Sequence, residues 1–483
     1  MNFKPVFHVI AWLLAVVGIL MGVCSLVSLL YGDPTEAWTA LGYSAAGTLA
    51  VAAALWSLTR NDQELSRRDG VGVVTFGWLL AAIAGTVPYV LSGTIASPIA
   101  ALFETVSGLT TTGASVIPVL EGVPKGILLW RALTHLIGGM GILVLVVAIL
   151  PFAGAGGMQL FRAETAGSTN DRVEPRMAAT AKMLWGVYVL LIVALIFLLR
   201  IGGMDWFDAA CHACATLATG GFSTRTASIA AYDSVYIENV LMIFMVLGAL
   251  NFALHYRALR GEFSPWWKDS STRFYLAVLA AATLICAGVL QGSGAAPTWR
   301  ESFRQAAFTC VSISTTTGFS TADFDLWPKA LRILLLLLML MGGCVGSTAG
   351  GIKVARIQMM FKAVAREIRL FMQPQAVIPV KMGRKILDDE VLLPILSFVA
   401  LYLLVAAAGS MAMLEFAPDL ATAVSSVVSC MGGVGPGLSA VGPTLNYSAI
   451  PAGGQAVLIG MMLAGRLEFF TLLVVFMPAF WRK

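Results

Sequence analysis

Charged residues are scarce in this chain of 483 residues. Lysine and arginine number 31 and aspartate and glutamate 26, so charged residues make up only 12% of the sequence, against 58% hydrophobic residues. An ordinary soluble domain carries about 25% charged residues. The chain therefore has too little charge to cover a water-facing surface, and no polar stretch is long enough to fold as a soluble domain. These absences exclude a soluble protein and indicate an integral membrane protein.

The sequence also lacks the residue clusters of a metal site or a catalytic centre. Cys211 and Cys214 form a CxxC pair, but no second pair lies at zinc spacing. The seven cysteines mostly lie in apolar segments, where a thiol acts as a small hydrophobic group. The four histidines form no HExxH-type cluster, and we interpret His135 and His212 as helix-packing residues. We therefore expect no enzyme and no cofactor in this chain.

What the sequence has in abundance is apolar stretches long enough to cross a hydrocarbon core of roughly 30 Å. The first is too long for a signal-peptide core and is interpreted as a retained helix. Candidate spanning segments lie at about 7–30, 38–58, 71–93, 127–150, 183–200, 235–256, 274–291, 328–345, 352–365, 391–414 and 454–480.

The basic residues indicate how these segments are oriented. If the amino terminus is cytoplasmic and each hairpin returns to that side, 22 of the 31 basic residues lie in inner segments and 8 in outer ones, with Arg466 remaining. Basic residues collect on the cytoplasmic side during insertion. The distribution therefore predicts cytoplasmic amino and carboxyl termini.

Four short segments share a pattern that no spanning helix could have. Each has about nine residues of helix-compatible sequence, then threonine and glycine, then an anchoring glycine; they lie at 101–115, 209–223, 306–320 and 423–437. The anchoring glycines are Gly113, Gly221, Gly318 and Gly435. Their spacings of 108, 97 and 117 residues fit a repeat of spanning helix, short re-entrant helix, extended strand and second spanning helix.

Irregular backbone at membrane depth persists only where it is buried in protein or lines a water-filled cavity. A short helix that enters from outside directs the negative end of its dipole at the membrane interior, which favours a cation. The extended strand that follows can direct carbonyl oxygens at an axis, and four such strands can replace the hydration shell of a potassium ion. The pattern therefore predicts a cation pore without any fixed negative charge in its filter.

The four filter sequences, TTTGAS, ATGGFS, TTTGFS and GGVGPGL, resemble those of the Trk/Ktr superfamily of potassium transporters. The resemblance covers roughly residues 70–481, and the helix pair before it resembles the extra amino-terminal hairpin of the Trk branch. It implies an all-α integral membrane fold of four pseudo-repeated helix–pore-helix–filter–helix units around one ion pore. The predicted units are an amino-terminal hairpin at 1–69 and pore repeats at 70–161, 162–262, 263–385 and 386–483.

By resemblance, potassium would meet the filter carbonyls and no other metal would be held. The implied ion-binding residues are Thr111, Thr112, Gly113, Thr219, Gly220, Gly221, Thr316, Thr317, Gly318, Gly433, Val434 and Gly435. One departure is Gly432-Gly433 in the fourth repeat, where many relatives carry two asparagines. If those asparagines buttress the filter, selectivity would be looser here.

A glycine-rich segment at 341–353 interrupts an apolar run after the third filter. Each glycine costs a helix interior about 1 kcal/mol relative to alanine, so five of them should break the helix. The resemblance implies an intramembrane loop that blocks the pore until it moves; a small-residue packing surface is the alternative. The implied gate residues are Gly342, Gly343, Gly346, Ser347, Thr348, Gly350 and Gly351.

Arg466 lies inside the last spanning segment. A charge there costs at least about 2.5–3.5 kcal/mol on insertion scales, so it should face protein or water. The resemblance implies an arginine that projects into the pore near the gating loop; a purely structural pair is the alternative. Glu104, Asp205 and Asp208 are interpreted as stabilisers of helix amino termini.

Two other functional classes compete with the pore. A sodium- or proton-coupled secondary transporter would also use broken helices, but two inverted halves are expected there rather than four similar units. A membrane-embedded enzyme would need clustered acid–base or metal residues, and this sequence has none.

The resemblance further implies partners and a location. It implies a cytosolic ring of nucleotide-binding regulatory subunits, a homodimer of pore subunits and a bacterial inner membrane, with no nucleic acid. The basic stretch 353–385, directly after the gating segment, is the predicted docking face, although it could instead contact anionic lipid. No nucleotide fingerprint occurs in the chain, so nucleotide control would come from the partner.

Overall fold

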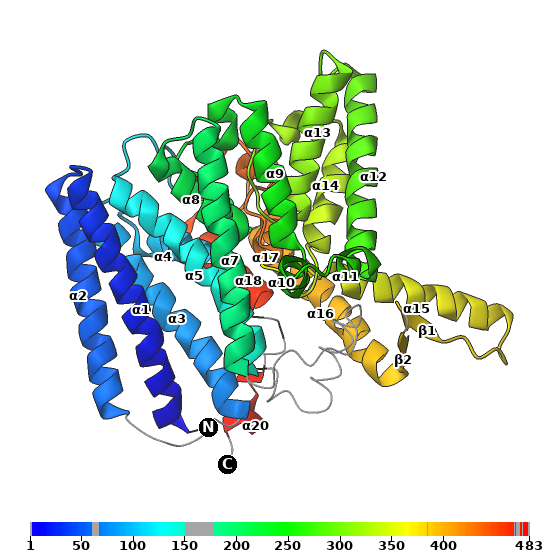
Figure 1. The fold of residues 1–483 in the computed structure, drawn as a ribbon, viewed down its shortest axis with the longest axis horizontal. Coiled ribbons are helices and arrows are strands. Elements are labelled where there is room, and N and C mark those ends of the chain that lie inside the picture. The colour runs from blue at the N-terminus through cyan, green and yellow to red at the C-terminus, as the bar shows by residue number, and fades with distance from the viewer. Residues whose placement is uncertain are drawn as a thin grey trace.

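The computed structural model is a bundle of helices in which long spanning helices alternate with short ones (Figure 1). It describes residues 2–59, 67–149, 177–383, 385–467, 469, 474, 475 and 477–481. Among these residues, six helices are long and apolar enough to cross a membrane, or seven if one bent pair counts as a single span. The predicted all-α membrane fold is confirmed, with one small addition, an antiparallel hairpin of β1 (Val380–Met382) and β2 (Lys385–Leu387).

The amino-terminal pair consists of α1 (Phe3–Leu30) and α2 (Thr35–Leu58), which pack side by side at one edge of the bundle (Figure 1). Gly18 lets the two helices approach, because an added β-carbon there would lie 2.8 Å from the Leu49 side chain. At its other end α1 lies near the carboxyl-terminal α20 (Pro478–Trp481), since the rings of Phe3 and Trp481 are 6.5 Å apart. The first and last helices therefore meet at one end of the molecule.

Four similar units follow in sequence order. The first consists of α3 (Arg67–Leu91), α4 (Pro98–Leu109) and α5 (Lys125–Ile149). The second consists of α7 (Met177–Ile201), α8 (Trp206–Leu217), α9 (Val235–Ala249) and α10 (Phe252–Leu259). The third consists of α12 (Ser270–Ser293), α13 (Trp299–Ser314) and α14 (Lys329–Met341), preceded by the short α11 (Ser264–Lys268), and the fourth of α16 (Asp389–Met413), α17 (Leu420–Gly432) and α18 (Ala452–Arg466). The predicted unit boundary at 161–162 lies outside the described residues.

The short helices α4, α8, α13 and α17 have 12, 12, 16 and 13 residues. At 1.5 Å per residue they are too short to cross the membrane. Each begins at a side chain that accepts a hydrogen bond from its first turn: Ser97, Asp205, Thr298 and Asp419. These caps satisfy amides that are unpaired at a helix start, and they fix where each re-entrant helix begins.

Four predicted spans differ from the structure. Two of them, 328–345 and 454–480, contain α14 and α18, which have only 13 and 15 residues and are not among the candidate spans. The segment 235–256 is not one helix, because α9 and α10 meet at an angle of 107°. The chain is extended at Leu250, and Asn251 then caps α10 by accepting a hydrogen bond from the amide of Ala253. This break shapes the floor of the site described below.

The segment 352–365 is not a spanning helix either. It is the first part of α15 (Val354–Met372), which projects sideways from the bundle together with the β-hairpin (Figure 1). The helix carries Arg356, Lys362, Arg366 and Arg369, and this charge removes it from the candidate spans. One side of this helix carries exposed apolar side chains.

Candidate functional site

The carboxyl ends of the four short helices converge on one cyclic arrangement. Just past each helix the chain passes through a left-handed residue: Thr111, Thr219, Thr316 and Gly433 have φ of 53°, 51°, 58° and 71°. Two residues later come the anchoring glycines Gly113, Gly221, Gly318 and Gly435, with φ of 79°, 76°, 80° and 99°. The four strands therefore share one backbone shape, although the fourth shares little sequence with the others.

Each anchoring glycine lies against the strand of the next repeat. An added β-carbon on Gly113 would lie 2.0 Å from the carbonyl oxygen of Gly220, and one on Gly221 2.0 Å from that of Thr317. One on Gly318 would lie 1.9 Å from the carbonyl oxygen of Val434. The circle closes because an added β-carbon on Gly435 would lie 2.7 Å from the carbonyl oxygen of Thr112. The structure thus brings all twelve predicted filter residues into one ring of four strands.

The loops that follow the strands join the repeats in the same cyclic order. The amide of Leu120 donates to the Thr226 hydroxyl, that of Ala230 to the carbonyl of Ser320, and that of Tyr447 to the carbonyl of Ser115. The Ser320 hydroxyl donates to the carbonyl of Pro443, which links the third and fourth repeats. Hydrogen bonds from the Thr226 hydroxyl and amide lower the pKa of the Glu121 carboxyl. The Glu121 carboxylate therefore stays ionised in this link between the two loops. The ring is held from outside as well as from its helices.

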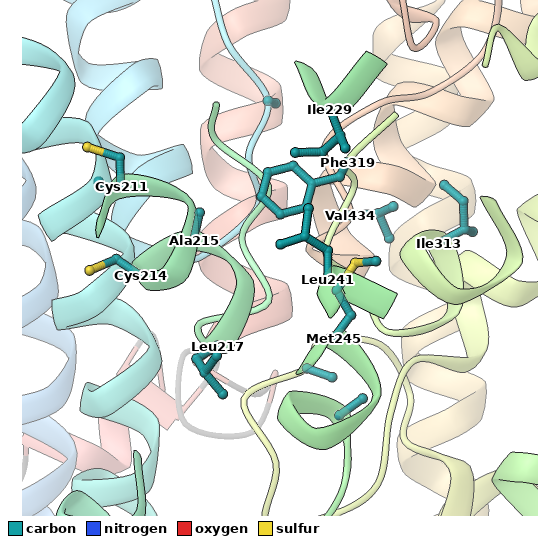
Figure 2. Packing of buried hydrophobic residues seen from close by; sticks show 14 of the residues in the cluster. Cys211, Cys214, Ala215, Leu217, Ile229, Leu241, Met245, Ile313, Phe319 and Val434 are labelled. Carbon is teal, nitrogen blue, oxygen red and sulfur yellow. The ribbon is translucent and has the colours of Figure 1, made fainter. Parts of the chain in front are cut away.

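Part of the apolar core packs behind the ring. Val434 belongs to the same buried core as Ile313 and Phe319, and Figure 2 shows how these residues lie with Leu241 and Met245 of α9. Tyr447 adds one polar contact, because its hydroxyl donates to the carbonyl of Gly435 at 2.7 Å. The carbonyl of Gly435 is thus engaged by a side chain of its own repeat.

An ion pair lies buried beside the first two strands. Glu104 of α4 is 0% exposed and Arg131 of α5 is 2% exposed, and the Nε of Arg131 lies 2.8 Å from the carboxylate. The carboxylate also accepts hydrogen bonds from Ser115 and from the amide of Val116. The guanidinium donates to the carbonyl of Ser223 in the second repeat. The pair therefore ties two neighbouring strands together.

This pair corrects the interpretation of Glu104 as a helix-start stabiliser. The prediction was wrong because Glu104 lies in the second turn of α4, where its carboxylate faces Arg131. Asp205 does cap α8, by accepting from the amide of Asp208. Sequence reasoning also missed Arg131, although a lone arginine at the start of an apolar segment was the available signal.

The predicted gate residues form an irregular loop directly beneath the ring. The Thr348 hydroxyl donates to the carbonyls of Leu217 and Gly248 at 2.9 and 3.0 Å, and it lies 3.3 Å from that of Thr219. The amide of Gly350 donates to the Thr316 hydroxyl at 2.8 Å. The loop thus touches the second and third strands, and the helix breaks where its glycines predicted.

The break between α9 and α10 receives this loop. The amide of Cys344 donates to the carbonyl of Ala249, and the amide of Phe252 donates to the carbonyl of Gly346. At Gly346 φ is 75°, and an added β-carbon would lie 2.9 Å from the Asn251 side chain. Backbone groups that the bent helix leaves unpaired are therefore satisfied by the loop.

Arg466 lies at the end of α18, 8% exposed, next to the same loop. Its guanidinium donates to the carbonyl of Thr348 at 3.0 Å and to that of Gly138 in α5 at 3.1 Å. Within the described part of the chain, no carboxylate pairs with it. Glu468 lies outside the described residues. The guanidinium is thus held by backbone oxygens, and one of them belongs to the loop.

Among the described residues, no group of three or more histidine, cysteine, aspartate or glutamate side chains could hold a metal ion. Cys211 and Cys214 are buried and free. His212 is held by the carbonyl of Asp208 and the hydroxyl of Ser223, which agrees with its interpretation as a packing residue.

We predict that Arg131→Ala lowers the thermal midpoint of the detergent-solubilised protein, because removing one partner of a buried pair costs about 3–5 kcal/mol. The control is Arg366→Ala, since Arg366 pairs with Asp389, which is 78% exposed, and such pairs contribute about 0–1 kcal/mol. In the double variant Arg131→Met/Glu104→Gln we expect part of the loss to be recovered. Equal midpoints for Arg131→Ala and Arg366→Ala would contradict this account.

Known proteins that are similar to this chain are cation transport proteins. A family model described as a cation transport protein, TrkH, matches residues 43–483. The Trk system potassium uptake protein TrkH of Escherichia coli K12 is 39% identical over 488 aligned residues, covering all of both chains. TrkG of the same strain is 33% identical, covering 89% of this chain and 88% of its own. The crystal structure of the potassium transporter TrkH from Vibrio parahaemolyticus matches over the full length of both chains, with a TM-score of 0.92 and 36% identity.

These similarities extend over nearly the whole chain, and the family comprises membrane transport proteins rather than enzymes. This agrees with the expectation from the sequence that the chain is not an enzyme. The chain belongs to the TrkH family of cation transport proteins.

Proposed function

We propose that this protein takes up potassium ions across the bacterial inner membrane through the ring of four strands. The observation that carries the proposal is the closed circle of contacts between each anchoring glycine and the carbonyl of the next repeat. Carbonyl oxygens gathered in this way can replace the hydration shell of a monovalent cation. The relatives named above as potassium uptake proteins support potassium as that cation.

The proposed ion-binding groups are the filter carbonyls, and potassium is the transported substrate. They belong to the residues predicted from the sequence, Thr111 to Gly113, Thr219 to Gly221, Thr316 to Gly318 and Gly433 to Gly435. The four short helices direct their negative dipole ends at this region, which stabilises a cation there. Glu104 is neutralised by Arg131, so the field comes from dipoles rather than from a fixed charge. We further propose that the four predicted repeats are the structural units of the pore.

The glycine-rich loop is the proposed gate. It lies against the inner side of the ring through Thr348 and Gly350, in the path of an ion that leaves the strands toward the cytoplasm. The base of the loop closes on itself, since the amides of Ile352 and Lys353 donate to the carbonyls of Leu340 and Met341. A short segment hinged at a narrow base can move without disturbing the bundle.

Arg466 is proposed to hold this gate shut. Its two hydrogen bonds link the loop to α5, and its positive charge opposes a cation at that depth. A hydrogen bond to a charged group contributes roughly 1.5–3 kcal/mol. Together these effects favour the closed loop until some other interaction displaces it.

Regulation is proposed to enter through α15, which follows the loop directly. Lys353 joins the two, because its ammonium donates to the loop carbonyl of Ala349 and its backbone begins the helix at φ 79°. Lys362 fixes the hairpin by donating to the carbonyl of Lys381. A cytosolic ring of nucleotide-binding subunits that moved α15 would therefore move the loop. The proposal places α15 on the cytoplasmic side of the membrane, and it places both chain termini on that side as well.

A homodimer is proposed to form along the free side of α15. Phe361, Val364, Ile368 and Phe371 are all exposed, Phe371 by 90%. Their spacing of three and four residues places them on one stripe of the helix. Ala355, Met359 and Ala363, on the other side, pack against the hairpin and α16. A second copy of the same stripe is the partner that a two-fold axis would supply.

The alternative function is sodium- or proton-coupled cation transport by the same pore. The four-fold arrangement of re-entrant helices favours a simple ion path, since a coupled transporter of the usual kind has two inverted halves. The uptake experiment below separates the two possibilities.

We predict that the protein restores growth at low potassium, and rubidium uptake, in a bacterium without potassium uptake systems. Uptake should be unchanged when the sodium gradient is removed. Gly318→Ala should reduce uptake at least about tenfold, because a left-handed φ costs an alanine roughly 1–2 kcal/mol and the collision with Val434 adds to that. Gly292→Ala, with open space at that position, is the matched control. Absence of uptake by the unaltered protein would refute the function, and sodium dependence would favour the coupled alternative.

Arg466→Ala should raise rubidium leak in proteoliposomes that lack any partner by about tenfold or more, given the hydrogen bonds that are lost. Arg466→Lys keeps the charge but cannot span both carbonyls, so we expect an intermediate leak. If leak through Arg466→Ala equals that of the unaltered protein, the arginine does not hold the gate.

Phe371→Gln combined with Ile368→Gln should shift the purified protein from dimer to monomer in light scattering. The control is Leu26→Gln, a lipid-facing residue of α1 that is 57% exposed. A mass that stays dimeric in the double variant would place the dimer interface elsewhere.

A further inference from the structure

The second filter strand is backed differently from the first and third. In those two strands the residues on either side of the left-handed threonine are threonines whose hydroxyls form a pair. Thr110 and Thr112 are 2.8 Å apart, and Thr315 and Thr317 are 2.8 Å apart. At the corresponding positions of the second strand lie Ala218 and Gly220. That strand therefore has no hydroxyl pair to hold its shape.

The backbone conformation does not require a glycine at position 220. The left-handed residues of its strand are Thr219 and Gly221, and Gly220 is not among the residues with positive φ. Threonine occupies the same backbone position in the first and third strands, as Thr112 and Thr317. A side chain would therefore suit this backbone, and another constraint must exclude it.

The ring of His135 supplies that constraint. An added β-carbon on Gly220 would lie 2.8, 2.8 and 2.9 Å from Cγ, Nδ1 and Cδ2 of His135. The ring cannot swing away freely, because it stacks on Phe222 at a centroid distance of 4.2 Å. Phe222 in turn lies 4.0 Å from the guanidinium carbon of Arg131, one turn earlier on α5. His135 and Gly220 are thus a sterically matched pair.

The histidine is also an unusual choice for filling space. It is 0% exposed, and neither ring nitrogen has a hydrogen-bond partner among the described residues. A buried polar group without a partner destabilises the fold, and an apolar side chain would avoid that cost. The imidazole of His135 offsets this cost by placing a flat, rigid ring against the second strand.

We propose that His135 is a positioning residue that sets the carbonyl of Gly220 and thereby helps to determine ion discrimination. The proposal rests on the proposed function of the ring as a filter. The Gly220 carbonyl faces Gly113 of the first strand. His135 of α5 therefore restrains the position of Gly220 and, through it, the contact between the first and second strands. The imidazole ring of His135 takes the place of the hydroxyl pair that shapes the first and third strands.

The test is a double-mutant cycle with His135→Ala, Gly220→Ala and both together. Coupling between residues in contact appears as non-additive effects. We expect Gly220→Ala to lower the thermal midpoint and to reduce rubidium uptake about tenfold or more, and the double variant to recover both toward the level of His135→Ala. His135→Ala alone should keep uptake but reduce the preference for potassium over sodium, measured by sodium competition, about threefold or more. His8→Ala, a histidine of the amino-terminal pair that faces Trp56, is the control for loss of an imidazole.

The outcomes are separable. If the double variant melts and transports no better than Gly220→Ala, the two residues are not a matched pair and the proposal is overturned. If His135→Ala leaves the sodium competition unchanged, the positioning role in discrimination is overturned. The thermal midpoints are independent of ion flux, so steric coupling can be measured even if the unaltered protein takes up no rubidium, an outcome that would refute the proposed function itself.

Discussion

The close approach of each anchoring glycine to a carbonyl of the next strand is the contact on which the rest of the structure depends. Gly113, Gly221, Gly318 and Gly435 each leave no room for a β-carbon, because the space is filled by the backbone of the neighbouring repeat. A circle of such contacts cannot be altered at one point without displacing two strands. The loops that follow the strands, the Glu104–Arg131 pair and the Tyr447 hydroxyl all support the same circle. The bundle can be understood as a support for these four short strands.

The four repeats reach one backbone shape by different chemical means. The first and third hold it with threonine hydroxyl pairs, the second lies against a histidine ring, and the fourth places Val434 in the apolar core. Gly433 in the fourth repeat adopts the left-handed conformation that threonine adopts in the other three. The backbone shape is therefore common to the four strands, whereas the groups that support it differ from one strand to the next. Asymmetry behind a symmetric ring is thus the main departure from a four-fold pore.

The region beneath the ring is built from interruptions of regular structure. The bend between α9 and α10 leaves backbone groups at Ala249 and Phe252 that the loop after α14 satisfies. The end of α18 brings Arg466 to the same loop. Every one of these interactions uses backbone groups of a segment that has no helical bonds of its own. Such a segment has fewer internal interactions to break than a helix, which is consistent with its proposed role as the gate.

Much of this could be predicted from the amino-acid order. Low charge and long apolar runs determine a membrane protein, and four anchoring glycines at similar spacing determine four re-entrant units, because no spanning helix tolerates such segments. The position of the helix break at Gly342 also follows from local glycine content. What only the tertiary structure decided was which residues far apart in the sequence meet: Glu104 with Arg131 inside the first repeat, and Gly220 with His135 and Arg466 with Thr348 between repeats. Those pairs are separated by 27, 85 and 118 residues, and their contact depends on how the helices pack rather than on any local pattern. Local chemistry determines where a chain can bend, whereas packing decides what each bend encounters.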